Sequence, residues 1–403
     1  MELIKGGICA AKGFQASGVH CGIRKNKTKK DLALIVSQTR AAAAATYTTN
    51  LVKGAPIAVT KANISDGYAQ AVICNSGNAN TCNANGTEIA QGMCALVEQY
   101  TGISAEDVVV ASTGVIGQQM TLDPIADGMQ NLVDGLGENS KDAAHAIMTT
   151  DTQLKEVAVS FEIGGKVCSM GGIAKGSGMI HPNMATMLCF LTTDTAITPE
   201  MLQKALSATI VDTFNMISID GDTSTNDMVV ILANGMAENP CISETGEDFD
   251  VFCKALKELC TIISKKIAAD GEGATKLLVC SVSHAETDAI ARTVSKSVIC
   301  SSLLKAAMFG ADANWGRVLC AIGYSGAPVD IHKIDVQFRS DAGSVLVCKD
   351  GMGTDFSEPL AKEVLMRDEI SIDIDLKSGD ACASAFGCDL TYDYVKINGD
   401  YRT

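Results

Sequence analysis

Residues 171–188 are the stretch of this sequence whose residue types and spacing are best suited to chemistry. They combine four glycines, Lys175 and Pro182 just ahead of an apolar segment that predicts a buried strand. A P-loop requires its lysine to stand between a glycine and a Ser or Thr. The order here is Lys175-Gly176-Ser177, and the G-x-G-x-x-G pattern of a dinucleotide site is also absent. On composition alone, a tight glycine turn leading into a core strand explains the stretch as well as a binding site does.

The run from Lys175 to Leu188 resembles the signature of the ornithine acetyltransferase family, also called glutamate N-acetyltransferases. The match is long and contiguous, which chance explains poorly. Further matching segments are spread over nearly the whole chain, at residues 12–14, 48–50, 75–80, 112–117, 149–152, 220–227, 270–276 and 401–403. The sequence is therefore identified as a member of this family.

The resemblance implies an enzyme that cuts its own chain between Ala185 and Thr186 and then uses Thr186 as its nucleophile. A threonine hydroxyl is a weak nucleophile at neutral pH and needs a base beside it. Cleavage would create that base, because the new α-amine of Thr186 has an unperturbed pKa of ~8. Ala185 is small enough to leave room for the hydroxyl, and Pro182 stiffens the approach. The implied cycle is ping-pong: the acetyl group of N-acetylornithine moves to the threonine oxygen, ornithine leaves, and glutamate takes the acetyl group.

The resemblance also implies the rest of the site. Thr113 and Gly114 match the family's oxyanion hole, which offers one hydroxyl and one backbone N–H to the negative charge of the tetrahedral intermediate. The positions that match the family's substrate contacts are Thr152, Lys175, Thr186, Glu272, Asn398 and Thr403. A lysine can pair with a substrate carboxylate and a glutamate with an ammonium group, which suits amino-acid substrates.

These residues also have structural alternatives. Lys175 can be a solvated loop lysine, and Glu272 can be a surface carboxylate that follows a helix. Asn398 and Thr403 lie on a tail that frays unless something holds it. The complete set of motifs favours the functional interpretation of all four.

Two further motifs are expected to be structural. His181 is not needed as a base, because the amine of Thr186 fills that role, so a packed or polar turn residue is expected. Residues 220–227 partly resemble a calcium loop, but Thr225 stands where an EF-hand has glycine and Ile231 where it has glutamate. We therefore expect a polar turn near the active site and no metal.

Functions from other classes remain open at this point. A self-cleaving hydrolase or aminopeptidase also exposes a Ser or Thr nucleophile, and water would then replace glutamate as the acceptor. A binding or scaffold protein that never cleaves is the second alternative. The segment from Lys175 to Thr186 favours transfer, and glutamate-dependent release of ornithine discriminates between these functions.

Within the family, some members also accept acetyl-CoA as donor, and some serve antibiotic pathways. No motif here decides the donor, and the commoner arginine role is expected. The resemblance further implies that an N-terminal fragment, 1–185, and a C-terminal fragment, 186–403, stay associated as two copies of each. No other cofactor is implied.

Strands and helices alternate along the chain, which predicts a mixed α/β (α+β) fold of layered sheets and helices. The resemblance adds that this is an autoprocessed fold of the N-terminal-nucleophile type. Strands are predicted at 108–112, 228–232, 277–280 and 370–374, and the last alternates apolar and polar residues. Helices are predicted from Thr198 to about Phe214, over 249–269 and over 288–308.

The composition limits the classes of protein. With 47% hydrophobic and 20% charged residues, the 403-residue chain is expected to fold around a substantial core. A net charge of −15 argues against a nucleic-acid binder. The 16 cysteines stand singly and without C-x-x-C spacing, so we expect small buried hydrophobes in a reduced cytoplasm. No secretory signal and no apolar run of ~20 residues is evident.

Overall fold

The computed structural model describes residues 1–181 and 187–399. They divide into two compact units. The first comprises the described residues of Met1–Gly176, Asn183–Val211 and Thr223–Ile263, and the second those of Ser177–Pro182, Asp212–Asp222 and Ser264–Thr403. Each unit takes residues from both sides of position 186. The predicted boundary between fragments 1–185 and 186–403 therefore does not coincide with the boundaries of the compact units.

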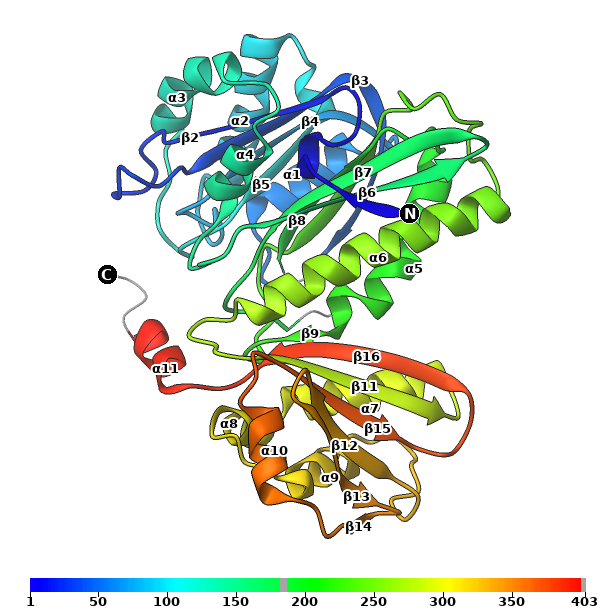
Figure 1. Cartoon of the computed structure of the whole chain (residues 1–403). Helices are drawn as coiled ribbons and strands as arrows, with labels where there is room; N and C mark the ends of the chain where they lie inside the picture. Colours follow the sequence, from blue (N-terminus) through cyan, green and yellow to red (C-terminus); the bar gives the residue numbers. More distant parts are fainter. Residues whose placement is uncertain (182–186, 400–403) are drawn as a thin grey trace. The chain divides into compact units, whose positions relative to one another are not determined.

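The first unit is built on one large sheet, drawn from blue to green in Figure 1. Its strands are β1 (Glu2–Ile4), β2 (Phe14–Val19), β3 (Leu32–Tyr47), β4 (Tyr68–Asn75), β5 (Val108–Ser112), β6 (Lys155–Ile163), β7 (Lys166–Lys175), β8 (Leu188–Thr193) and β10 (Met228–Ala233). Their order is β1-β6-β7-β8-β10-β3-β4-β5, and β2 also pairs with β3. β8 is parallel to β10 and antiparallel to β7. The end of β7 therefore lies beside the start of β8, which in turn lies beside the start of β10.

The long strand β3 belongs to two parts of this sheet. β2 pairs with residues 32–37 of β3 and β10 with residues 42–47. β4 pairs with both parts, at residues 32–36 and 41–42, and its register shifts between them. Ala33 and Ile35 share a hydrophobic core with Phe190 of β8 and Val230 of β10. Both parts of the sheet thus line one hydrophobic core.

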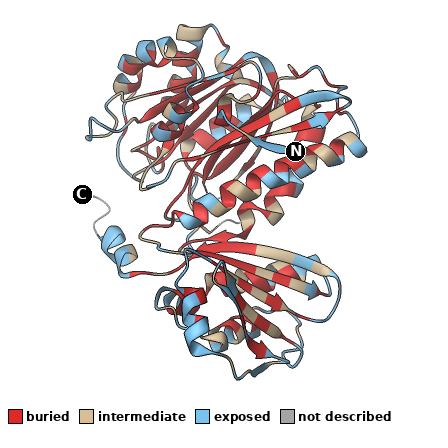
Figure 2. Cartoon of the chain, viewed as in Figure 1, coloured by how far each residue is buried: buried red, intermediate tan, exposed pale blue. Residues whose placement is uncertain are grey.

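Helices cover the sheet of the first unit. They are α1 (Ala55–Asn63), α2 (Gly86–Thr101), α3 (Asp123–Asp134), α4 (Ser140–Ile147), α5 (Pro199–Asp212) and α6 (Glu247–Ala269), with short 3-10 turns η1 (Gly7–Cys9) and η2 (Ala105–Asp107). α2 and α3 form a second core with the faces of β3, β4 and β5 that point away from the shared interior. The strands between these layers are almost entirely buried, as Figure 2 shows.

Phe252 of α6 packs on β6 and is fully buried. Its ring meets the edge of Phe161 with the centroids 6.2 Å apart. Phe252→Ala is expected to lower the free energy of unfolding by about 3–5 kcal/mol, because it removes buried apolar area and leaves a cavity. Urea unfolding followed by circular dichroism measures this loss. The exposed Phe309→Ala should cost far less, and equal losses for the two variants would contradict the packing described here.

The second unit contains its own sheet and helices. The strands are β9 (Ile217–Ser218), β11 (Leu277–Ala285), β12 (Asp335–Ser340), β13 (Gly343–Lys349), β14 (Met352–Gly353), β15 (Glu369–Asp375) and β16 (Ala381–Cys388), in the order β14-β13-β12-β15-β11-β16-β9. The helices are α7 (Asp288–Cys300), α8 (Ser302–Phe309), α9 (Trp315–Gly323), α10 (Glu358–Leu365) and α11 (Tyr392–Gly399), with the 3-10 turn η3 (Phe214–Met216). α7 packs against β11 and β16.

The mixed α/β class is confirmed, and so are the four predicted strands, which are β5, β10, β11 and β15. The helix that follows Thr198 is confirmed as α5, although it ends at Asp212 and Phe214 lies in a 3-10 turn. The helix predicted over 249–269 is α6. In these elements the local apolar periodicity agrees with the packing, so the pattern was sufficient.

The prediction of one helix over residues 288–308 is wrong. The structure has two helices, α7 and α8, separated at Ser301, whose backbone is extended (φ −69°, ψ 106°). The Ser301 hydroxyl accepts a hydrogen bond from Leu304 N–H at 3.3 Å and so caps α8. The apolar spacing continues across the break, which is why periodicity did not detect it.

The structure tests the expectation that the cysteines are small buried residues. All 16 cysteines are free thiols, of which eight are buried. The exposed ones are Cys82, Cys241, Cys320 and Cys382, so the expectation of buried thiols is only partly correct.

Within residues 1–181 and 187–399, no helix is long and apolar enough to cross a membrane. The same residues contain no group of three or more His, Cys, Asp or Glu side chains that could hold a metal ion.

Candidate active site

In the first unit, Lys175 is the last residue of β7 and is 8% exposed. It lies opposite Leu188, the first residue of β8. Met187, just before β8, accepts a hydrogen bond through its carbonyl from Met228 N–H at 2.8 Å. Ala185 and Thr186, the predicted cleavage residues, lie outside the described residues. The described chain therefore places a buried lysine beside the strand that follows them.

The charge of Lys175 acts on three buried groups that come from different elements. Burial raises the pKa of Cys74 on β4 and of Asp227 ahead of β10, and the lysine charge opposes both shifts. At Asp151 the same charge helps to lower the pKa. Lys175 thus points among buried side chains, and the alternative of a solvated loop lysine is wrong.

Asp151 anchors this part of the site. Its Oδ1 accepts hydrogen bonds from Lys155 Nζ at 2.6 Å and from Gly176 N–H at 2.7 Å. Its Oδ2 accepts one from Thr149 N–H at 2.9 Å. Burial alone would raise the pKa of Asp151, but the charges of Lys155 and Lys175 and the Gly176 hydrogen bond outweigh it, so the pKa lies well below its ordinary value. Asp151 therefore holds residues 149–152 against the end of β7.

Asp151→Asn is expected to lower the free energy of unfolding at pH 7 by about 3–5 kcal/mol, because it leaves the Lys155 ammonium buried without its counter-charge. Because the pKa of the Asp151 carboxyl is lower in the folded than in the unfolded chain, its ionised form stabilises the fold. This contribution is complete above the unfolded-state pKa of about 3.9 and is lost as the pH falls below that value. The difference between wild type and variant should therefore shrink below pH 4. Urea titrations at several pH values measure it.

The matched control for this prediction is Asp142→Asn, which removes the carboxylate of a partly exposed ion pair with Lys30. Such pairs contribute only about 0–1 kcal/mol. If Asp151→Asn were no more destabilising than Asp142→Asn at pH 7, the buried pair would not stabilise the fold.

Thr113 and Gly114 form a turn directly after β5. Thr113 N–H donates to Asn75 O at 3.0 Å and Val115 N–H to Gly77 O at 3.3 Å. Gly114 has φ +135°, and a Cβ there would lie 2.3 Å from the Gly77 carbonyl carbon. Position 114 therefore requires glycine. The Thr113 hydroxyl makes no hydrogen bond to any other described residue, so it is available as a donor to a ligand.

Asn226 connects this turn to the start of β10. Its Nδ2 donates to Ala79 O at 2.6 Å and to Ser112 O at 2.9 Å, while its Oδ1 accepts from Thr81 Oγ1 at 2.6 Å. Asp227, the next residue, is buried, and no described residue is a hydrogen-bond partner of its Oδ2. Burial raises the pKa of Asp227 well above its ordinary value. Asn226 thus fixes the end of β5, just before Thr113, to the start of β10, where Asp227 lies within reach of the Lys175 charge.

In the second unit, Glu272 and Asn398 are partners. Asn398 Nδ2 donates to Glu272 Oε2 at 2.7 Å, and Glu272 N–H donates to Ser177 O at 2.9 Å. Glu272 is 6% exposed, so the alternative of a surface carboxylate is wrong. A Cβ on Gly178 would lie 2.4 Å from the Glu272 carboxyl carbon. The glycine therefore lets the segment ahead of the predicted cleavage point approach this carboxylate.

His181 is a half-buried residue of the second unit, as expected for a packed turn. Its Nδ1 lies 3.0 Å from Ser218 Oγ and 3.6 Å from Cys300 Sγ. Burial and the nearby charge of Lys296 lower the pKa of His181 to about 4. The imidazole is therefore neutral at physiological pH.

The described chain contains six of the predicted site residues. Those of the first unit are Thr113, Gly114, Thr152 and Lys175, and those of the second are Glu272 and Asn398. Thr152 is exposed beside the Asp151 anchor. Thr403, like the cleavage residues, lies outside the described residues. Sequence reasoning gave no individual role to Asp151, Asn226 or Asp227, and expected only that residues 220–227 form a polar turn near the active site. All three lie in the matching motifs, and Asp227 directly precedes β10.

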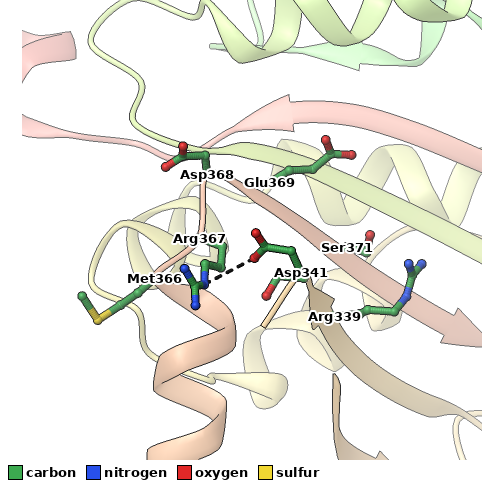
Figure 3. Close-up of a pocket in the computed structure, with 8 residues that line it drawn as sticks. Arg339, Asp341, Met366, Arg367, Asp368, Glu369 and Ser371 are labelled. Carbon is green, nitrogen blue, oxygen red and sulfur yellow. Dashed lines mark ion pairs between the residues drawn. The ribbon is translucent and has the colours of Figure 1, made fainter. Parts of the chain in front are cut away.

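A separate hollow of about 620 Å³ lies at the β12 and β15 region of the second unit (Figure 3). It is lined by Arg339, Ser340, Asp341, Met366, Arg367, Asp368, Glu369 and Ser371. Its arginines already pair with carboxylates: Arg339 with Asp373 at 2.8 Å and Arg367 with Asp341 at 3.3 Å. None of the six predicted site residues that the structure describes lines this hollow.

Fold and site together are those of a mixed α/β enzyme. The model of the ArgJ family matches residues 15–403. The arginine biosynthesis bifunctional protein ArgJ of Caldanaerobacter subterraneus subsp. tengcongensis is 50% identical over 405 residues, which cover 100% of both chains. The protein of the same name from Bacillus subtilis is 46% identical, over 99% of this chain and 97% of the relative. The chain belongs to the ArgJ family.

The chain is also similar to solved structures. A crystal structure of ArgJ from Bacillus halodurans is 46% identical, with a TM-score of 0.49, over 52% of this chain and 97% of that chain. A structure of ornithine acetyltransferase from Mycobacterium tuberculosis complexed with ornithine is 35% identical, with a TM-score of 0.42, over 46% of this chain and 99% of that chain. The family assignment depends on the family model and on the full-length relatives, and it confirms the family expected from the sequence.

Proposed function

We propose that this chain is a glutamate N-acetyltransferase of arginine biosynthesis. It transfers the acetyl group of N-acetylornithine to glutamate through an acetyl-enzyme on Thr186, after the chain has cut itself between Ala185 and Thr186. The observation that carries the proposal is the match of residues 15–403 to the ArgJ family, with the segment from Lys175 to Thr186 intact. The buried surroundings of Lys175 and Glu272 support it.

Self-cleavage begins when the Thr186 hydroxyl attacks the Ala185 carbonyl. The amide C–N bond breaks, an ester to the threonine oxygen forms, and the nitrogen of Thr186 takes up the hydroxyl proton. Water then hydrolyses the ester, so the Ala185 carboxylate and the free hydroxyl and α-amine of Thr186 remain. With an unperturbed pKa of ~8, this amine can accept the hydroxyl proton during catalysis.

Acetyl transfer then uses the same oxygen twice. The Thr186 oxygen attacks the acetyl carbonyl of N-acetylornithine, and the resulting oxyanion accepts hydrogen bonds from the Thr113 hydroxyl and the Gly114 N–H. The C–N bond breaks, the departing ornithine amine takes the proton held by the α-amine, and an acetyl ester remains. The amine of glutamate attacks this ester, and the threonine oxygen leaves with its proton restored.

The charged residues divide the recognition of amino-acid substrates. Lys175 supplies a buried ammonium for a substrate carboxylate, and Glu272 supplies a carboxylate for a substrate ammonium. Asn398 orients Glu272 through their 2.7 Å hydrogen bond. Thr152 and Thr403 complete the proposed contacts. These groups carry out the chemistry without a cofactor, and acetyl-CoA is a candidate second donor.

The proposed assembly keeps both fragments together, as two copies of each, in the cytoplasm. The shared sheet supports the association of the fragments, because β7 of the N-terminal fragment pairs with β8 of the C-terminal fragment along six residue pairs. Cutting the connection between these strands leaves their hydrogen bonds in place.

The test of the proposed function measures ornithine released from N-acetylornithine with and without glutamate. Release that requires glutamate and yields N-acetylglutamate in equal amount supports the transferase. Release into water alone would show a hydrolase instead. Correctly cut protein that transfers no acetyl group to any acceptor would contradict the enzyme.

A further inference from the structure

The segment just ahead of the predicted cleavage point is held by residues 218–220 in the second unit. Asp220 Oδ2 accepts a hydrogen bond from Met179 N–H at 2.6 Å, and Asp220 Oδ1 accepts one from Ile180 N–H at 2.9 Å. Ile219 N–H donates to Ile180 O at 2.8 Å. Three backbone groups of Met179 and Ile180 are thus fixed just before His181, the last described residue before position 182.

These hydrogen bonds hold Met179 in a backbone conformation that is unfavourable for a residue with a side chain. Met179 has φ +56°, in the left-handed region that a side chain with a Cβ seldom adopts. The residue before it, Gly178, packs against the Glu272 carboxyl group. Because one carboxylate accepts both neighbouring amides, Asp220 compensates for the cost of this turn.

Asp220 is itself held in place by neighbouring residues of the second unit. It follows β9 closely, and β9 pairs with β16 through Ile217 opposite Phe386. Asp222 N–H donates to Asp220 Oδ1 at 3.2 Å. Burial and the nearby charge of Asp220 raise the pKa of the Tyr394 hydroxyl, which places this side chain close to the carboxylate. The hydrogen bonds from Met179 and Ile180 to Asp220 therefore fix the turn at Met179 relative to the sheet of the second unit.

We propose that Asp220 is a positioning residue for self-cleavage. This inference rests on the proposed function, in which the Thr186 hydroxyl must approach the Ala185 carbonyl. Such an intramolecular attack is fast only when the chain on either side is held near the reactive geometry. Asp220 holds the preceding turn by charge-assisted hydrogen bonds, whereas acetyl transfer takes place after the peptide bond is cut and needs the restraint less.

The experiment follows cleavage of the newly synthesised full-length chain by intact mass over time. Asp220→Asn keeps one acceptor oxygen and places an N–H₂ group against the second amide. It is expected to slow cleavage about tenfold or more, the effect of losing roughly 1.4 kcal/mol of transition-state stabilisation. The turnover number per cut molecule should stay within about twofold of wild type. Asp220→Glu keeps both acceptors on a longer side chain and should recover part of the rate.

Two matched controls separate the effect of the Asp220 hydrogen bonds from the effects of local negative charge and of a neighbouring side chain. Asp222→Asn removes the same charge two residues away at an exposed position. Tyr394→Phe removes a hydroxyl whose pKa is raised by burial and by the nearby charge of Asp220, and leaves the amides of Met179 and Ile180 in place. Both are expected to cleave at the wild-type rate.

Each outcome decides the inference. Cleavage of Asp220→Asn at the wild-type rate would overturn it and leave the proposed function intact, provided Thr186→Ala stays uncut. A parallel fall in thermal stability, cleavage and turnover, without recovery in Asp220→Glu, would show a general structural role and also overturn it. A wild-type chain that is active without being cut would remove the proposed self-cleavage, and this inference with it.

Discussion

Thr186→Ala is expected to yield a single uncut chain of 42.0 kDa with no acetyl transfer, whereas the wild type yields two fragments. In proportion to residues 1–185 and 186–403, the fragments have masses of roughly 19 and 23 kDa. The methyl side chain cannot attack the Ala185 carbonyl, so neither the α-amine nor the nucleophile is produced. Loss of a catalytic nucleophile typically costs on the order of 10⁴-fold or more in rate.

Intact mass and the ornithine-release assay check this prediction on the same samples. Thr186→Ser is the matched control, because it retains the hydroxyl and should both cleave and transfer. Fully active wild-type protein with a single mass near 42 kDa would contradict the mechanism, since the base would then have to come from another residue. His181 is a poor candidate for that base, because its hydrogen bond with Ser218 occupies Nδ1 and its pKa is lowered to about 4.

Thr113→Val is expected to lower kcat by about 10²–10³-fold while KM changes little. Valine has nearly the shape of threonine but cannot donate a hydrogen bond, and the negative charge of the tetrahedral intermediate exists only during the reaction. The Thr113 backbone should keep its place, because its N–H is bonded to Asn75 O and the turn is braced through Asn226 at Ser112 O. The fold should therefore be unchanged.

Steady-state kinetics of cut Thr113→Val and Thr113→Ser check the prediction. The serine variant keeps a hydroxyl and should retain most of the activity. A rise in KM at constant kcat in the valine variant would show that Thr113 binds the substrate and does not stabilise the oxyanion. If self-cleavage passes through a similar oxyanion at the same turn, Thr113→Val should also accumulate uncut chain.

The sequence alone was sufficient where the signal is local. The run from Lys175 to Leu188 identified the family, and the family model and the full-length relatives confirm it. Apolar patterns located β5, β10, β11 and β15, because in each strand the residues that the pattern marks as apolar are the ones that pack. The pattern failed at Ser301, where a side-chain cap interrupts an apolar periodicity that continues into the next helix.

The anchors of the site depend on contacts between residues that are far apart in the chain. Asp151 meets Gly176 25 residues later, Asp220 meets Met179 across 41 residues, and Asn398 meets Glu272 across 126. No spacing rule connects such pairs, since each depends on how strands and turns pack. The burial of Glu272 likewise could not be read from a hydrophilic motif after a helix. The sequence thus predicts which residues carry the chemistry, and packing determines what holds the described ones, because desolvation and hydrogen-bond partners exist only once distant segments have come together.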